Sequence, residues 1–156
     1  MITGPEAEPA MLSQTAEYAL RTILYIAQRT EEEGPVQTEA LAEALDIPRN
    51  YLSKILHRLA QEGLLQSSRG RGGGFVLTRS PKHLPIIDIV GLFDQITATR
   101  KCLLGRPTCS DVNPCDAHAA WKDMSDRVAR FFRDTTVGDL LGQSAAAAAL
   151  RRKARV

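Results

Sequence analysis

The sequence predicts a mostly helical fold with one small β-hairpin, and three observations support this prediction. Apolar residues recur at helical spacing in three segments of the first 60 residues. A glycine-rich turn then separates two short apolar runs, which is the pattern of a hairpin. A long segment near the C-terminus again carries one apolar face, so we expect a long helix there.

Length and composition agree with a folded domain. The chain has 156 residues, of which 44% are hydrophobic and 24% charged, and this balance excludes a wholly disordered protein. Its apolar stretches are short and interrupted by charges, so we expect no membrane-spanning helix. The first ten residues lack the basic start and apolar run of a secretory signal. We therefore expect a cytoplasmic protein, and three cysteines, an odd number, argue against a disulfide framework in it.

Capping residues and prolines mark the expected helix boundaries in the first half. Ser13 is expected to cap the first helix and Thr38 the second. The second helix stops at Asp46–Ile47–Pro48, because a residue before proline avoids the helical conformation. A third helix starts at Pro48 and ends at Gly63.

The third helix has one apolar face and one polar face. The expected buried stripe consists of Tyr51, Leu52, Ile55, Leu56 and Leu59. The opposite face carries Arg49, Asn50, Ser53, Lys54, His57 and Arg58. Two short helices joined by a tight turn, the second one basic on its outer side, are typical of a helix-turn-helix.

The hairpin follows this helix pair directly. The runs Leu64–Ser68 and Phe75–Thr78 flank a glycine-rich turn that carries Arg69 and Arg71. A hairpin with a basic tip in this place predicts the wing of a winged helix. A nucleotide-binding loop would end in Gly-Lys-Ser/Thr and lead from a strand into a helix, and neither condition holds. We therefore expect no enzyme.

Charge is distributed unevenly along the chain. Residues 48–82 carry seven basic residues and one acidic residue, whereas residues 1–47 carry two basic and nine acidic residues. A basic block of this kind favours a polyanion, here double-stranded DNA, as the partner. On charge alone, a solvated basic face without a partner is the alternative.

Seven residues are candidate DNA contacts. They are Arg49, Asn50, Tyr51, Ser53 and Lys54 in the third helix, and Arg69 and Arg71 in the wing. The N-terminal end of a recognition helix enters the major groove, where arginine pairs with guanine and asparagine with adenine. The glycine-rich tip can lie along a minor groove with an arginine inserted. Tyr51 is either a core aromatic with an exposed hydroxyl or a phosphate contact.

The second half contains a short helix, a cysteine-bearing loop and the long helix. Pro85 starts the short helix, and residues 98–116 are expected to be irregular. The long helix is expected over Ala117–Arg133, followed by a short helix over Thr135–Leu141. The expected inward side chains of the long helix are Trp121, Met124, Val128, Phe131 and Phe132.

These elements divide the chain into four segments. Residues 1–10 are expected to be a flexible N-terminal extension, and residues 11–82 a winged helix-turn-helix. Residues 83–141 hold the cysteine loop and the long helix, which is the expected dimerisation element. Residues 142–156 form a basic tail that we expect to be disordered.

Cys102, Cys109 and Cys115 lie in one expected loop, and His118 follows. A structural zinc site usually begins with two cysteines separated by two to four residues, and this spacing is absent here. The wider spacing suits an iron–sulfur cluster, whose thiolate ligands reach different irons. Three unrelated thiols in a loop are the alternative.

Several motifs together resemble the IscR/NsrR family of bacterial winged-helix regulators, also called the Rrf-two family. They are AEYALR at 16–21, IPRNYLSK at 47–54, SRGRGGGF at 68–75, Asp88–Ile89, the cysteine loop and TVGDLL at 136–141. The resemblance covers about residues 11–141. It implies a transcription regulator, expected to be a repressor, whose DNA affinity depends on a 2Fe–2S or 4Fe–4S cluster. Such regulators respond to iron, redox or nitric oxide status.

The resemblance also implies the ligands. Three are Cys102, Cys109 and Cys115, and the fourth is either His118, at the position of the IscR-like histidine, or Glu17. Glu17 stands where, in NsrR-like proteins, an acidic residue reaches the cluster from the partner subunit. We favour His118, because it is close to Cys115 in sequence and ordering it costs little loop entropy.

Two details of the family pattern bear on these assignments. The spacing of the first two cysteines departs by one residue from the commonest one in the family, so the cluster type stays open. In the wing motif of the family the first arginine enters the minor groove, which makes Arg69 the preferred wing contact.

The main expectation is therefore a homodimer, with the long helix as its antiparallel seam, on a palindromic operator. Two other functions remain open. A cluster-free regulator would use the cysteines as a thiol or zinc switch. An iron–sulfur carrier with a basic docking face would show no sequence preference for DNA.

Overall fold

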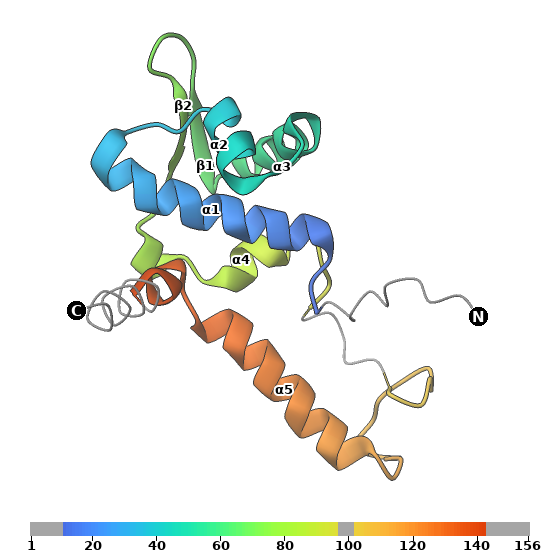
Figure 1. Cartoon of the computed structure of the whole chain (residues 1–156). Coiled ribbons are helices and arrows are strands. Elements are labelled where there is room, and N and C mark those ends of the chain that lie inside the picture. Colours follow the sequence, from blue (N-terminus) through green and yellow to red (C-terminus); the bar gives the residue numbers. More distant parts are fainter. Residues whose placement is uncertain (1–10, 97–101, 143–156) are drawn as a thin grey trace, which may run out of the picture.

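The structure is a computed structural model and describes residues 11–96 and 102–142 (Figure 1). The elements are α1 (Gln14–Glu33), α2 (Thr38–Leu45), α3 (Arg49–Gln61), β1 (Leu65–Ser68), β2 (Gly74–Leu77), α4 (Ile86–Val90) and α5 (His118–Asp134), with a 3₁₀ turn at Pro81–His83. Residues 137–142 are also helical. The predicted helical class with a two-stranded wing is confirmed. The expected N-terminal extension lies outside the described residues, as does nearly all of the expected tail.

The helix boundaries follow local capping chemistry. The Ser13 hydroxyl accepts a hydrogen bond from the backbone N–H of Ala16 at 3.2 Å and so caps α1. The prediction that Thr38 caps α2 is wrong by one residue. Gln37 has the extended backbone of a cap, with φ −78° and ψ 151°, and Thr38 is already helical. Asp46 adopts a left-handed conformation, which ends α2 and turns the chain into α3.

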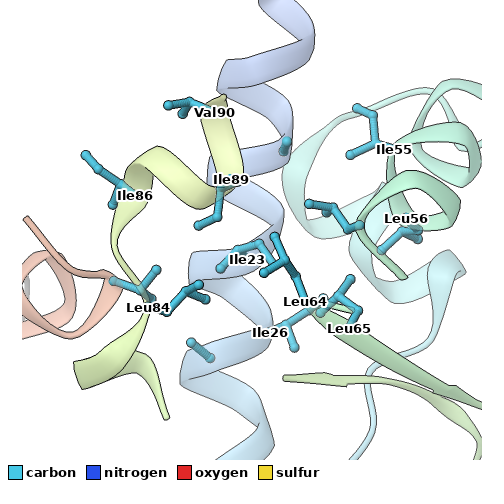
Figure 2. Packing of buried hydrophobic residues seen from close by; sticks show 14 of the residues in the cluster. Ile23, Ile26, Ile55, Leu56, Leu64, Leu65, Leu84, Ile86, Ile89 and Val90 are labelled. Atoms are coloured by element: carbon cyan, nitrogen blue, oxygen red, sulfur yellow. The ribbon is translucent and has the colours of Figure 1, made fainter. Parts of the chain in front are cut away.

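One hydrophobic core joins α1 to α3, α4 and the start of the wing. Figure 2 shows side chains from all of these elements around α1. The labelled core residues are Ile23, Ile26, Ile55, Leu56, Leu64, Leu65, Leu84, Ile86, Ile89 and Val90. Full burial of one such side chain stabilises the fold by about 2 kcal/mol. Because α2, α3 and α4 all contact α1, this helix is the centre of the core.

The wing is attached to the chain segment that precedes the helix-turn-helix. β1 and β2 pair antiparallel, with Leu65 opposite Leu77. In addition, Val36 and Phe75 exchange backbone hydrogen bonds of 3.0 and 2.9 Å, which ties β2 to the segment between α1 and α2. This close approach requires glycine at position 74, because a Cβ there would lie 2.5 Å from the Val36 carbonyl oxygen.

α5 extends away from the rest of the molecule, and its far end leads into the cysteine loop (Figure 1). At the near end, the Ile86 N–H donates to the Thr135 carbonyl and the Val137 N–H to the Leu84 carbonyl, both at 2.9 Å. In the described part of the chain no helix is long and apolar enough to cross a membrane.

The expectation that all five large side chains of α5 point inward is wrong for two of them. Phe132 is buried, whereas Met124 and Phe131 are 51% and 54% exposed. Only the near end of α5 meets the body of the molecule (Figure 1), so one protomer cannot cover the whole apolar face.

Candidate DNA interface and cysteine centre

α3 and the wing tip lie on the side of the molecule that faces away from α5 (Figure 1). Six of the seven candidate DNA contacts on these two elements are well exposed, and Tyr51 is exposed at 37%. The six are Arg49, Asn50, Ser53 and Lys54 in α3, and Arg69 and Arg71 at the wing tip. Both elements therefore carry exposed basic side chains, and we call the N-terminal half of α3 and the tip of the wing together the basic surface.

Not all of these side chains are equally available. Arg49 forms an ion pair with Glu39 of α2, and the Ser53 hydroxyl donates to the Arg49 carbonyl at 2.9 Å. Within residues 11–96 and 102–142, Asn50 and Lys54 form no side-chain hydrogen bond or ion pair. They can therefore meet a base or phosphate without first breaking a contact. Sequence reasoning missed Glu39, since nothing in the helical pattern indicates a contact from α2 to α3.

Tyr51 was expected in the buried stripe of α3, and this prediction is wrong. Its ring meets the ring of Tyr18 edge to face, with centroids 5.8 Å apart, and its hydroxyl is hydrogen-bonded to the Thr15 hydroxyl. Both partners belong to the first half of α1, so Tyr51 packs against the rim of α1 and not into the core. Its polar tip stays at the surface, as an aromatic hydroxyl prefers.

The three cysteines and His118 gather in two pairs at the far end of α5. The first pair is Cys102 and Cys115, since the Cys115 side chain is one of the groups that lower the pKa of the Cys102 thiol. The pKa of Cys102 is lowered, mainly by a hydrogen bond from the Arg106 backbone N–H, with burial acting in the opposite direction. A lowered pKa favours the thiolate, the form that binds metal ions.

The second pair is Cys109 and His118. Nδ1 of His118 lies 3.3 Å from Sγ of Cys109, and Nε2 lies 2.7 Å from Oδ1 of Asp111. The His118 residue is only 7% exposed. The Asp111 carboxylate also accepts two hydrogen bonds of 2.9 Å from Nζ of Lys122. The hydrogen bond to His118, together with Lys122, lowers the pKa of Asp111 to about 2.

The donor set fits an iron–sulfur cluster in its chemistry. Two ligands of one tetrahedral metal ion lie about 3.5 Å apart, so the 3.3 Å between Cys109 and His118 suits a shared metal. Among the described residues, no three His, Cys, Asp or Glu side chains form a group that could hold one metal ion. A two-iron cluster takes two protein ligands on each iron, so both pairs would have to come together around one centre to hold it.

The alternative fourth ligand, Glu17, is not part of either pair. It lies on the exposed side of α1, where its carboxylate is 3.6 Å from the guanidinium of Arg21. Asp111 and Lys122 are polar contacts of this centre that sequence reasoning missed. No sequence signal indicates them, because Asp111 stands in an irregular loop whose path depends on the whole fold.

A helix-turn-helix with a tethered wing and a basic reading surface defines a winged-helix DNA-binding transcription regulator. The comparison with protein families agrees and is more specific. The chain belongs to the Rrf2 family, described as iron-dependent transcriptional regulators, whose model matches residues 12–143.

Two relatives support this membership. A predicted HTH-type transcriptional regulator of Aquifex aeolicus is 35% identical over 133 residues, which are 84% of this chain and 91% of the relative. The HTH-type transcriptional regulator IscR of Escherichia coli is 31% identical over 130 residues, which are 83% of this chain and 79% of IscR. The family and these relatives are transcription regulators, which confirms the expectation that the protein is not an enzyme.

Solved structures show the same fold. IscR of T. potens superposes with a TM-score of 0.70 at 21% identity, covering 89% of this chain and 91% of its own. CymR of B. subtilis, titled the global cysteine regulator, superposes with a TM-score of 0.71 at 24% identity, covering 86% of this chain and 98% of its own. The protein is thus a DNA-binding transcription regulator of the Rrf2 family with the winged-helix fold.

Proposed function

We propose that the protein is a homodimeric repressor whose DNA affinity is controlled by an iron–sulfur cluster held by Cys102, Cys109, Cys115 and His118. The observation that carries this proposal is the 3.3 Å contact between Cys109 and His118, in the same loop region as Cys102 and Cys115. Bound there, a cluster supplies a group that reacts with oxidants and nitric oxide or is lost when iron is scarce.

His118 is the fourth ligand in this proposal, and Glu17 of the partner subunit is the alternative. His118 is already in contact with Cys109, so recruiting it requires little reordering. Glu17 would first have to leave Arg21.

Control of DNA binding would pass through α5. The cysteine loop is at one end of α5, and the other end is hydrogen-bonded to the segment that precedes α4. α4 in turn packs on α1, the central helix of the core. In a dimer joined along α5, a change of the loop would shift the population between two separations of the winged helices.

DNA recognition is assigned to the basic surface. The N-terminal half of α3 would read the major groove through Arg49 and Asn50, with Ser53, Lys54 and the Tyr51 hydroxyl on base or phosphate. Arg69 would enter the minor groove, with Arg71 near the backbone. Two such units related by a twofold axis would read a palindromic operator. Since chromosomal DNA is the partner, we place the protein in the cytoplasm.

A cluster-free regulator is the second candidate, and two observations favour it. The structurally similar CymR is titled a cysteine regulator, and Cys102 has the lowered pKa of a reactive thiol. In that case the cysteines would form a thiol or zinc switch. The third candidate, an iron–sulfur carrier, would bind DNA without sequence preference.

The deciding experiment is anaerobic reconstitution with iron and sulfide, followed by visible absorption and analysis of iron, sulfide and zinc. We expect a coloured wild-type protein and strong loss of cluster in Cys102→Ala, Cys109→Ala and Cys115→Ala. Thr108→Ala, an exposed position in the same loop, is the matched control. His118→Ala and Glu17→Ala compared side by side identify the fourth ligand.

Two results would reject the cluster. A wild-type protein that stays colourless and contains zinc supports the metal switch, and one without either metal supports the thiol switch. Binding of holo and apo protein to genomic fragments, before and after nitric oxide, then tests the regulatory step. Equal affinity of both forms for one selected site would contradict control by the cluster.

A further inference from the structure

The contact between His118 and Asp111 has a consequence for which ring nitrogen can bind a metal. We propose that Asp111 is a positioning residue that holds His118 in the tautomer with its proton on Nε2, so that Nδ1 is the metal-binding nitrogen. The inference rests on the proposed function, because it concerns the proposed fourth ligand. Asp111 is not itself a ligand in that proposal, and the donor atom of His118 is Nδ1.

The hydrogen-bonding capacities of the two groups decide where the imidazole proton lies. A neutral imidazole carries one N–H, and an ionised carboxylate can only accept. The 2.7 Å contact between Nε2 of His118 and Oδ1 of Asp111 therefore requires the proton on Nε2. Nδ1 is left with its lone pair, and it is the nitrogen that lies 3.3 Å from Cys109.

Asp111, whose side chain is 67% exposed, has a second contact from the same helix. Lys122 stands one turn after His118 on α5 and contacts both carboxylate oxygens at 2.9 Å. The His118 side chain is 8% exposed, so water competes little for Nε2. Asp111 thus lies between a buried ring and a lysine, which restricts both its place and the orientation of the imidazole.

A carboxylate on the second nitrogen of a metal-binding histidine orients the ring and raises its basicity as a ligand. Loss of such a partner typically costs about 10- to 100-fold in metal affinity. If Asp111 only formed a surface ion pair with Lys122, its removal would leave both the tautomer and the metal affinity unchanged. These two outcomes separate the positioning role from a purely structural one.

The first test uses the apo protein and needs no cluster. Histidine labelled with ¹⁵N is observed by NMR at a pH where the imidazole is neutral, and His118→Ala identifies the His118 signals. We expect a protonated Nε2 and an unprotonated Nδ1 in the wild type. Asp111→Ala should give a mixture of tautomers or the reverse one, and Asp111→Asn, which keeps a carbonyl acceptor, should retain the wild-type tautomer.

Asp116→Ala is the matched control, because Asp116 is an exposed carboxylate in the same loop and has no hydrogen bond or ion pair with the described residues. It should leave the tautomer unchanged. Circular dichroism confirms that α5 is intact in every variant. A wild-type His118 protonated on Nδ1, or a tautomer unaffected by Asp111→Ala, would overturn the inference.

The second test measures the reconstituted protein. Release of iron to a chelator should be about 10- to 100-fold faster in Asp111→Ala than in wild type, and unchanged in Asp116→Ala. The reduction potential should rise in Asp111→Ala, since the less basic imidazole stabilises oxidised iron less well. Equal release rates and potentials would overturn the inference alone. A wild-type protein that takes up no cluster would overturn the proposed function and the metal-binding role together.

Discussion

Arg49, the first residue of α3, forms an ion pair with Glu39 of α2. Both side chains are exposed, at 65% and 58%. An exposed ion pair contributes about 0 to 1 kcal/mol, so DNA can break it, but the pair competes with any base or phosphate that Arg49 would bind. Glu39 therefore holds a side chain that we propose as a DNA contact.

Removing that neighbour should strengthen DNA binding. Glu39→Gln is expected to increase operator affinity by up to about 5-fold, because Arg49 is released and one negative charge near the phosphates is lost. Fluorescence anisotropy with a labelled operator measures the change. Glu43→Gln, an exposed glutamate of the same helix, is the control for charge alone. If the gain persists in an Arg49→Ala background, the competition model is wrong.

Phosphate contacts should be visible in the salt dependence of binding. Lys54→Ala is expected to weaken binding and to reduce the slope of log affinity against log salt by about one unit. Arg69→Ala should in addition lower the preference for A·T-rich sequence where the wing tip lies, because narrow minor grooves attract arginine. Arg133→Ala removes an exposed arginine on α5, and its slope should equal that of wild type.

Exposed apolar residues on α5 should control the oligomeric state. Phe131→Asp is expected to convert the dimer to a monomer, because Phe131 and Met124, seven residues apart, form an apolar stripe that one protomer leaves uncovered. Analytical ultracentrifugation measures the result. Arg133→Asp, about 200° further round the helix, should remain dimeric. A monomeric wild type would refute the assignment of α5 as the seam.

Stability at acidic pH should depend on Asp139. This residue and Thr136 cap the helix at 137–142 reciprocally: Thr136 donates from its N–H and its hydroxyl to the carboxylate, and the Asp139 N–H donates to the Thr136 hydroxyl. The hydrogen bond from the Thr136 N–H is the main cause that lowers the pKa of Asp139 below its ordinary value.

A lowered folded-state pKa stabilises the native protein above the unfolded pKa of about 3.9, and this contribution is lost as the pH falls through the folded value. Asp139→Asn should therefore have a lower Tm than wild type at neutral pH, and the two should converge in acid. Thermal unfolding across this pH range measures the difference. Asp134→Asn changes an exposed carboxylate nearby and should show no such convergence.

Much of the fold was predictable because its signals are local. The hydroxyl of Ser13, the Asp46–Ile47–Pro48 step and the apolar spacing of α3 each act within a few residues. The expectations that failed depend on contacts distant in sequence. Tyr51 lies outside the core because it contacts Tyr18 and Thr15 of α1. Phe131 is exposed because no other part of the protomer covers it.

The candidate sites show the same division. Exposure of the residues in α3 and the wing follows from amphipathic spacing and turn chemistry, and the gathering of cysteines follows from their place in one loop. Two contacts depend on how a loop of irregular backbone folds over the start of α5. They are the pairing of Cys109 with His118 and the contact of Asp111 with the His118 ring. Irregular backbone has no repeat from which such contacts could be read.

The two backbone hydrogen bonds between Val36 and Phe75 fasten the wing to the chain in front of α2. Hinge bending between wing and recognition helix would have to break them, so each protomer should meet the duplex as a rigid body. A signal would then change the conformation of each winged helix very little. In the proposed dimer, a signal would alter the distance and angle between the two rigid protomers. Binding should then respond most strongly to the number of base pairs between half-sites.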